Sequence, residues 1–229
     1  ESISTPCRMV VDSRTSGLND HQAKGLNTLN NLQQLLMRFR AFRKVGAYDI
    51  SKMYNSVHLD IADQHTHRFL WRSCEDRKPD IWCITRVNLG DRPAGTIAIL
   101  AKNETARMFT SINPEAANVI IYCTYTDDVL TSVMTFSEAQ ALARDIEKIL
   151  KKGGFSIKGW VFGGSGVPEE MMVQGKQEVL GASYCSRGDY IHFPSTLNFS
   201  PKRRGVPTGP NLTVQDIPSG VPTALTRRL

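Results

Sequence analysis

Hydrophobic and polar positions along the chain change their spacing several times, and each change predicts a new secondary-structure element. In residues 29–42, apolar side chains recur at the i, i+3, i+4 and i+7 spacing of an amphipathic helix. Further helices are expected at residues 96–108 and 138–152. Ser137 and Gln140 predict a capping box at the start of the last of these helices.

Short runs rich in Val, Ile, Tyr and Thr, separated by turn residues, predict the strands. The expected strands are residues 7–12, 44–50, 67–72, 80–86, 119–123, 129–133, 155–160, 178–184 and 190–193. In this interpretation, residues 119–123 and 129–133 form a hairpin across the acidic turn Tyr125-Thr126-Asp127-Asp128. The chain therefore mixes helices with β-hairpins.

Composition limits the class of protein. The chain has 229 residues, of which 41% are hydrophobic and 22% charged, as in a soluble globular protein with a substantial core. No apolar run approaches the roughly 18 residues of a membrane span. The five cysteines are odd in number and form no CxxC pair, which favours reduced thiols in an intracellular protein over disulfides or a zinc site.

Positive charge gathers toward the C-terminal end. The net charge is +6, and residues 196–229 carry five cations and one anion. Five of the eleven prolines lie between Pro201 and Pro222, so we expect an extended, basic segment after a folded region of residues 1–195. Such a segment suits a polyanion such as nucleic acid, and a merely solvating tail explains the charge equally well. Because the chain opens at Glu1 without an initiator methionine, we expect it to be part of a longer polypeptide.

The acidic turn is the first candidate for chemistry. A tight turn can aim the adjacent carboxylates of Asp127 and Asp128 at one point, whereas neighbours in a regular strand point to opposite faces. Two like charges 4 Å apart cost roughly 4 kcal/mol at an effective dielectric of 20. A cation between them would relieve this repulsion, and hard oxygen ligands suit magnesium. A solvated Asp-Asp turn without function is the alternative.

Two further motifs are candidates for a functional role, and a pair of histidines is not. Asp49 is expected at the end of a strand, where its carboxylate can project over the sheet edge or cap the next turn. The turn that holds Gly90 and Arg92 precedes a predicted helix and can direct N–H groups and the guanidinium toward a phosphate, although a tight entry turn is commoner. His65 and His67 stand two apart without a nearby acidic or cysteine partner, so we expect surface or core histidines rather than metal ligands.

The order of these motifs resembles the palm of reverse transcriptases. A strand with Asp49 precedes a Gly-rich turn and helix, and a Y-x-D-D hairpin follows. Residues 8–12 resemble the fingers strand, residues 153–160 the later lysine-bearing motif, and residues 179–181 the primer-grip strand. The resemblance covers nearly the whole chain, and six weak motifs in the right order make it specific.

The amino-acid sequence of several stretches is most similar to that of the Bel/Pao group of LTR retrotransposons. These stretches are residues 18–21, 29–32, 69–72, 127–132 and 208–213. Two stretches depart from the pattern of that group. The second motif reads Asp91-Arg92-Pro93 where many members have Ser-Pro, and residues 161–164 replace a small-Ser-Asn run.

The resemblance implies an α+β polymerase palm, an antiparallel sheet packed on helices, with part of the fingers and without the thumb. It implies an RNA-directed DNA polymerase that transfers deoxynucleotides from dNTPs to a primer 3′ end on an RNA or DNA template. Two Mg²⁺ ions, for which Mn²⁺ can substitute, would be bound mainly by Asp49 and Asp127. The Ile50 carbonyl would be a backbone ligand, and Asp128 would be the third and less important carboxylate. The other implied partners are the protease, RNase H and integrase of a retroelement polyprotein, in a cytoplasmic virus-like particle and away from any membrane.

The resemblance also implies roles for three residues around the metals. Arg8 would hold the triphosphate, Lys158 would pair with the leaving pyrophosphate or give it a proton, and Tyr54 would lie beneath the incoming sugar. Two other classes of protein remain open: a catalytically inactive palm that only binds nucleic acid, and an unrelated two-magnesium nuclease. The intact carboxylates and Tyr54 disfavour the first, and the order of motifs disfavours the second.

Overall fold

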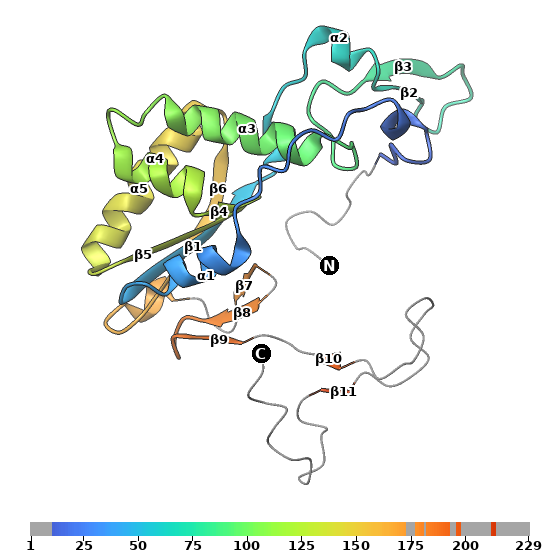
Figure 1. Ribbon diagram of the computed structural model, residues 1–229. Coiled ribbons are helices and arrows are strands. Elements are labelled where there is room, and N and C mark those ends of the chain that lie inside the picture. The colour runs from blue at the N-terminus through green and yellow to red at the C-terminus, as the bar shows by residue number, and fades with distance from the viewer. Residues whose placement is uncertain (1–10, 173–176, 181, 193–195, 198–211, 214–229) are drawn as a thin grey trace.

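A four-stranded antiparallel sheet with helices on both faces forms the centre of the molecule (Figure 1). The structure is a computed structural model that describes residues 11–172, 177–180, 182–192, 196–197 and 212–213. In spatial order the strands are β4 (Thr124–Tyr125), β5 (Asp128–Val133), β1 (Lys44–Ser51) and β6 (Ser156–Gly163). The long strand β1 therefore lies between β5 and β6.

The alternation of β1 divides the core between the two faces of the sheet. Tyr48 and Ile50 face the larger core, which α3 (Ala94–Arg107), α4 (Pro114–Tyr122) and α5 (Phe136–Lys152) cover. Val45 and Ala47 face the smaller core, together with Leu35 and Phe39 of α1 (Leu32–Phe39) and Tyr184 of β8 (Ala182–Cys185). This is the period of two that a strand covered on both faces requires.

Two smaller sheets flank the central one. The β2–β3 lobe comprises α2 (Ile61–Gln64), β2 (Arg68–Trp71) and β3 (Asp80–Cys83), and Figure 1 shows it extending away from the sheet. On the α1 side lie β7 (Gln177–Val179), β8 (Ala182–Cys185) and β9 (Tyr190–His192). The remaining short elements are the 3-10 helices η1 (Leu18–Asp20), η2 (Tyr54–Ser56) and η3 (Glu169–Met171), and the pair β10 (Thr196–Leu197) and β11 (Leu212–Thr213).

The expected strand at residues 119–123 is wrong, because these residues belong mostly to α4. Asn113 caps this helix by accepting a hydrogen bond from the Ala116 N–H, and Pro114 occupies its first turn. The buried residues Ala116, Ala117, Ile120 and Ile121 have helical spacing. The predicted hairpin across the acidic turn is present, but its first strand is the short β4, which pairs with β5.

Two other local expectations are corrected. The capping box of α5 is formed by Thr135 and Glu138, so the helix begins at Phe136. The strand expected at residues 178–184 is interrupted at Leu180, whose φ of 54° lies in the left-handed region and makes a turn between β7 and β8.

The other expected helices and strands occur at their predicted places with shifted ends. The strand expected at residues 7–12, including Arg8, lies almost entirely outside the described residues, as does most of residues 196–229. In the part of the chain that is described, no helix has the length and apolar character needed to cross a membrane.

Candidate active site

The pairing of β1 with β5 brings the three predicted aspartates together. Asp49 is the direct partner of Asp128 in the antiparallel register, and side chains of such partners lie on the same face. Asp127 occupies the turn before β5, and its carbonyl accepts the Ile50 N–H at 2.9 Å. The carboxyl groups of Asp49 and Asp127 lie within hydrogen-bonding range.

Thr126 holds the turn that presents Asp127, and sequence reasoning missed it. Its φ of 51° is unusual for a β-branched residue and marks a strained turn. The Thr126 hydroxyl lies 2.8 Å from Asp127 Oδ1 and 2.7 Å from the Tyr125 carbonyl, and it can donate to either. A hydroxyl next to an acidic pair in a tight turn is the signal that could have identified it.

The electrostatics of the site favour a cation. Burial raises the pKa of Asp49, the charge of Asp127 raises it further, and Lys158 opposes the shift. Burial, followed by the charge of Asp127, raises the pKa of Asp128 to about 6, although a hydrogen bond from the Leu180 N–H acts in the opposite direction. The positive charge of Lys158 does not cancel the rise in the pKa of Asp49.

A β-bulge brings Lys158 to Asp49. Tyr48 pairs with Trp160 while Ile50 pairs with Ile157, so Lys158 and Gly159 both lie opposite Asp49. Gly159 has a φ of 149°, and bulges of this kind redirect a side chain. Lys158 Nζ lies 3.7 Å from Asp49 Oδ2, with the two side chains 61% and 35% exposed, so the pair contributes well under about 1 kcal/mol.

Tyr54 lies between the acidic turn and the start of α3. Burial raises its pKa, and the charge of Asp127 raises it further, which places the phenol near that carboxylate. A Cβ added to Gly95 at the start of α3 would lie 4.0 Å from the Tyr54 hydroxyl. Ile50 is buried in the larger core with 1% of the residue exposed, so its side chain cannot bind a ligand.

The donor set fits Mg²⁺ or Mn²⁺ bound together with a substrate. Among the described residues, no three His, Cys, Asp or Glu side chains are gathered closely enough to hold a metal ion by themselves. Magnesium in phosphoryl-transfer sites is commonly bound by one or two carboxylates plus substrate phosphates. Asp49 and Asp127, whose proximity raises the pKa of Asp49 despite Lys158, supply such a pair.

Comparison with solved structures identifies the fold. A foamy viral protease–reverse transcriptase in complex with an RNA/DNA hybrid matches with a TM-score of 0.53 at 19% identity, over 80% of this chain and 22% of that chain. The dRH form in complex with double-stranded DNA matches with a TM-score of 0.51 at 17% identity, over 78% of this chain and 27% of that chain.

The chain has the fold of a reverse transcriptase. It spans about a quarter of the length of these two viral proteins. By sequence, it matches no protein-family model and no curated protein. At such low identity, the similarity establishes the reverse-transcriptase fold alone, and the site rests on the geometry described above.

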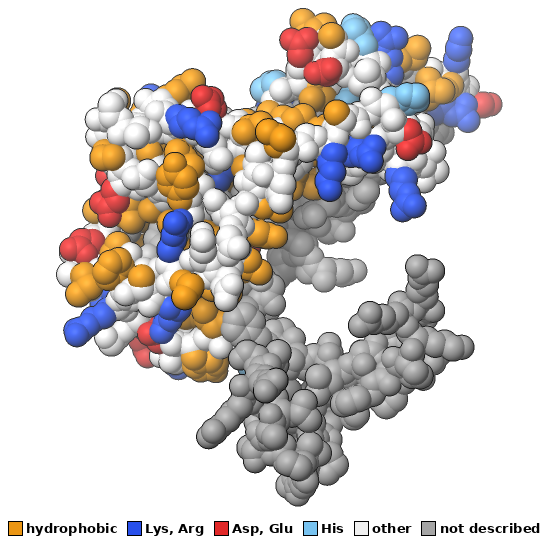
Figure 2. All heavy atoms as spheres, viewed as in Figure 1, with side chains coloured by type: hydrophobic (Ala, Val, Ile, Leu, Met, Phe, Trp, Pro, Cys, Tyr) orange, Lys and Arg blue, Asp and Glu red, His pale blue; other side chains and the backbone are white. Residues whose placement is uncertain are grey.

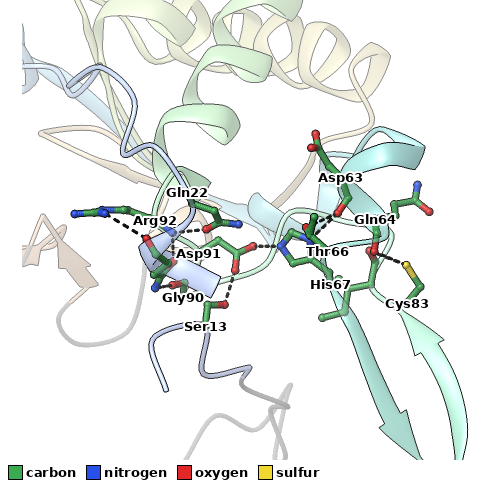
Figure 3. Close-up of polar contacts among 12 residues, drawn as sticks. Ser13, Gln22, Asp63, Gln64, Thr66, His67, Cys83, Gly90, Asp91 and Arg92 are labelled. Atoms are coloured by element: carbon green, nitrogen blue, oxygen red, sulfur yellow. Dashed lines mark hydrogen bonds and ion pairs between the residues drawn. The ribbon is translucent and has the colours of Figure 1, made fainter. Parts of the chain in front are cut away.

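In this reverse-transcriptase fold, Gly90 and Arg92 lie in a second polar cluster together with Ser13, His67 and Asp91 (Figure 3). The Asn19 side chain donates to the Gly90 carbonyl at 2.9 Å and accepts the Arg92 N–H at 2.7 Å. The Arg92 guanidinium also donates to the Asn19 carbonyl at 3.2 Å. Because the Arg92 N–H is already bound to Asn19, it is not free to bind a phosphate at this turn.

A buried carboxylate ties this second cluster to the β2–β3 lobe. Asp91 accepts hydrogen bonds from the Ser13 hydroxyl at 2.5 Å and from His67 Nε2 at 2.9 Å (Figure 3). The side chains of His67 and Asp91 are each only 4% exposed. The expectation that His67 is a core histidine is therefore confirmed. Its acidic partner is Asp91, which sequence reasoning did not identify.

Proposed function

We propose that the chain is the palm, with part of the fingers, of an RNA-directed DNA polymerase from a retroelement of the Bel/Pao type. The observation that carries this proposal is the convergence of Asp49, Asp127 and Asp128 in a reverse-transcriptase fold. The reaction would be attack of a primer 3′ hydroxyl on the α-phosphate of a dNTP, with release of pyrophosphate. The Bel/Pao assignment rests on the sequence stretches given above.

Asp49 and Asp127 would hold the metals, with the Ile50 carbonyl and Asp128 as further oxygen donors. Two Mg²⁺ or Mn²⁺ ions would lower the pKa of the attacking hydroxyl and neutralise charge on the transferred phosphate. Thr126 would keep Asp127 aimed at this position through its hydroxyl. The protein's own contribution is mainly orientation, because phosphoryl transfer depends on positioning and charge neutralisation.

Three cationic side chains and one tyrosine would complete the site. Lys158, whose Nζ lies 3.7 Å from Asp49 Oδ2, would pair with the leaving pyrophosphate or give it a proton. Tyr54, near Asp127, would lie beneath the sugar of the incoming nucleotide. Arg8 would hold the triphosphate, and the turn of Gly90 and Arg92 would contact a phosphate of the nucleic acid.

The proposed partners are a primer–template and dNTPs. The two similar viral proteins were solved with an RNA/DNA hybrid and with double-stranded DNA, which supports nucleic acid as the partner class. The parent protein would be a retroelement polyprotein with protease, RNase H and integrase, acting in a cytoplasmic virus-like particle.

A primer-extension assay tests the proposal. With a homopolymer template, Mg²⁺ and the matching dNTP, the wild-type chain should lengthen a labelled primer. Asp49→Asn and Asp127→Asn should abolish extension, and Asp128→Asn should reduce it less. Glu147→Gln, which removes an exposed carboxylate on α5, is the matched control and should extend normally.

Other outcomes would identify the alternatives. A shortened primer would indicate a nuclease, and an unchanged primer from wild-type protein that still binds the duplex would indicate an inactive palm. Extension at a near wild-type rate by Asp127→Asn would overturn the assignment of the site.

A further inference from the structure

Lys102 places an amine inside the hydrophobic core. Figure 2 shows Lys and Arg side chains projecting from the surface of the molecule, but Lys102 of α3 is only 1% exposed. It shares a helix face with Ala98, Ile99 and Ala106, which all belong to the larger core. Burying a charged group without a partner is unfavourable, so this position disfavours the ammonium form of the side chain.

The amine has one partner, which is the end of helix α4. Lys102 Nζ donates a hydrogen bond to the Ile120 carbonyl at 2.8 Å, and within the described part of the chain this is its one acceptor. An ammonium group has three N–H donors, whereas a neutral amine has two. Among the described residues, no carboxylate lies within ion-pairing distance of Lys102. These contacts suit a neutral amine better than an ammonium group.

Burial brings the protonation of this amine into the neutral range of pH. It lowers the pKa of Lys102 from an ordinary value of 10.5 to about 7, although the carbonyl end of a helix favours a cation. Because the folded pKa lies below the ordinary value, an opened chain binds more protons than the closed one between these values. The closed state is therefore favoured as pH rises through this range and disfavoured as pH falls.

The titratable groups of the elements that pack against α3, namely α4, α5 and η2, do not pair with Lys102. Those of α4 and α5 are exposed apart from Asp145, which binds Lys148 and Asn113. The others have neighbours of their own, as in the pairs Glu104–Arg107, Tyr54–Asp127 and Cys123–Arg38. The protonation of Lys102 therefore depends on its own burial and not on a neighbouring charge.

Lys102 is one of several side chains that hold the last turn of α4. The Ile120 carbonyl also accepts the Thr124 hydroxyl at 2.8 Å. Asn30 and Arg38 donate to the carbonyls of the next two residues, at 2.8 Å and 2.7 Å. The last carbonyls of a helix have no partner within it, so these bonds determine how the chain leaves α4. The strand β4 and the acidic turn follow directly.

We propose that Lys102 is a pH-sensitive positioning residue, which holds the end of α4 and the acidic turn in place as a neutral amine and releases them when solvent protonates it. The added proton creates an ammonium group with two N–H donors that lack an acceptor in the core. Water can satisfy these donors only if α3 and the end of α4 separate. The strand β4 and the acidic turn would then move together with the end of α4.

This inference goes beyond the proposed polymerase activity, because it concerns the fold and needs neither a metal ion nor a dNTP. If the chain is a polymerase, mild acid would displace the carboxylates of the acidic turn and slow extension. The opening is nevertheless measurable without catalysis. A chain that fails to extend a primer could still show it, and its absence would leave the primer-extension result intact.

Hydrogen exchange of the full 229-residue chain in EDTA, at about pH 6.5 and pH 8.5, tests the proposal. The Cys123 and Leu130 amides report on this region, because they bind the Val119 and Cys123 carbonyls. After correction for the intrinsic effect of pH on exchange, both should exchange about tenfold or more faster at the lower pH. Lys102→Met keeps a long side chain that cannot be protonated, so its two rates should differ by less than about threefold.

Lys148→Met, which removes an exposed lysine of α5, is the matched control and should keep the wild-type response to pH. In wild type at the lower pH, the Cys123 and Leu130 amides should also exchange faster than those of β1, since the proposed opening is local. An unchanged response to pH in Lys102→Met overturns the proposal. Exchange of these two amides no faster than that of β1 also overturns it, because the whole fold would then be opening.

Discussion

Asp128 differs from the other two carboxylates of the site because another sheet contacts it. The N–H of Leu180, in the turn between β7 and β8, donates a hydrogen bond to its carboxylate. Burial nevertheless dominates and raises the pKa of Asp128 to about 6. Asp128 therefore links the hairpin of the acidic turn to the β7–β9 sheet, although burial there disfavours its ionised form.

Because burial raises the pKa of Asp128, we expect Asp128→Asn to stabilise the chain at high pH and not at low pH. With a folded pKa of about 6 and an ordinary value of 3.8, the folded chain binds more protons between these pH values, so its stability falls as pH rises through them. In EDTA at pH 7 the variant should be more stable by about 1–2 kcal/mol, allowing for partial exposure, and equal to wild type near pH 4. Chemical denaturation at both pH values measures the difference.

Asp145→Asn is the control with the opposite sign. A hydrogen bond from Lys148 lowers the pKa of Asp145, so its removal should not stabilise the chain at pH 7. A gain of the same size in both variants would show that the loss of any negative charge is responsible.

Tyr54 is predicted to act as a steric gate against ribonucleotides. Its position near Asp127 would place the ring under the sugar, where a 2′ hydroxyl collides and a 2′ hydrogen fits. Such overpacking costs typically about 1–3 kcal/mol, or roughly one to two decades in rate. Tyr54→Val should therefore raise ribonucleotide relative to deoxynucleotide incorporation, while unchanged selectivity in an active variant would make Tyr54 a core aromatic only.

Local patterns in the sequence identified Asp127 and Asp128, whereas Asp49, Tyr54 and Lys158 were predicted to lie near them only through the resemblance to a reverse-transcriptase palm. Asp127 and Asp128 share a turn that four residues define, so the pattern sufficed. The approach of Lys158 to Asp49 depends on a bulge at Gly159, which changes no hydrophobic period. Asp91 and His67 are separated by a whole hairpin, and no local pattern links them.

At the scale of elements, Tyr184 connects β8 and β9 to the rest of the fold. Its ring packs edge-on against Phe39 of α1, with centroids 5.3 Å apart. Its hydroxyl donates to Asp189 at 2.9 Å, and Asp189 also pairs with Arg40 just after α1. This contact is possible because Gly163 of β6 has no side chain.

Gly163→Ala should loosen this connection. An added Cβ would lie 1.8 Å from the Tyr184 hydroxyl, so the ring must move and leave its partners. We expect a loss of about 2 kcal/mol or more in unfolding free energy, measured by chemical denaturation, with partial rescue by Tyr184→Phe. Gly95→Ala, whose Cβ meets only the Tyr54 hydroxyl at 4.0 Å, should be nearly neutral, and an equal loss there would exclude the clash as the cause.

The helix α4 shows why one element was predicted with the wrong type. Val119, Ile120, Ile121 and Tyr122 form an apolar run that suits a buried strand and a buried helix equally well. The deciding signals lie upstream, in the Asn113 cap and in Pro114. Strands and helices with an unambiguous period, such as β1 and α5, were predicted at nearly their observed bounds.

At the scale of the whole molecule, Asp91 joins three segments: the N-terminal stretch at Ser13, the β2–β3 lobe at His67, and the entry to α3. Asp91→Ala should cost about 3 kcal/mol in unfolding free energy, because it leaves buried polar groups without their partner. It should also speed limited proteolysis near residue 13. Asp63→Asn is the control, since only the Asp63 backbone carbonyl bonds His67, and equal effects in the two variants would contradict this role of Asp91.

The central position of β1 has a consequence for synthesis on the ribosome. This strand is made before both of its partners, β5 and β6, and it cannot be paired on both sides until Gly163 has been made. Sheets built from such distant pairings fold slowly, in about milliseconds to seconds, because loop closure precedes any gain from contact. The nascent chain therefore carries Val45, Ala47 and Tyr48 unpaired until β5 has been made, and these are the residues that a chaperone would have to shield.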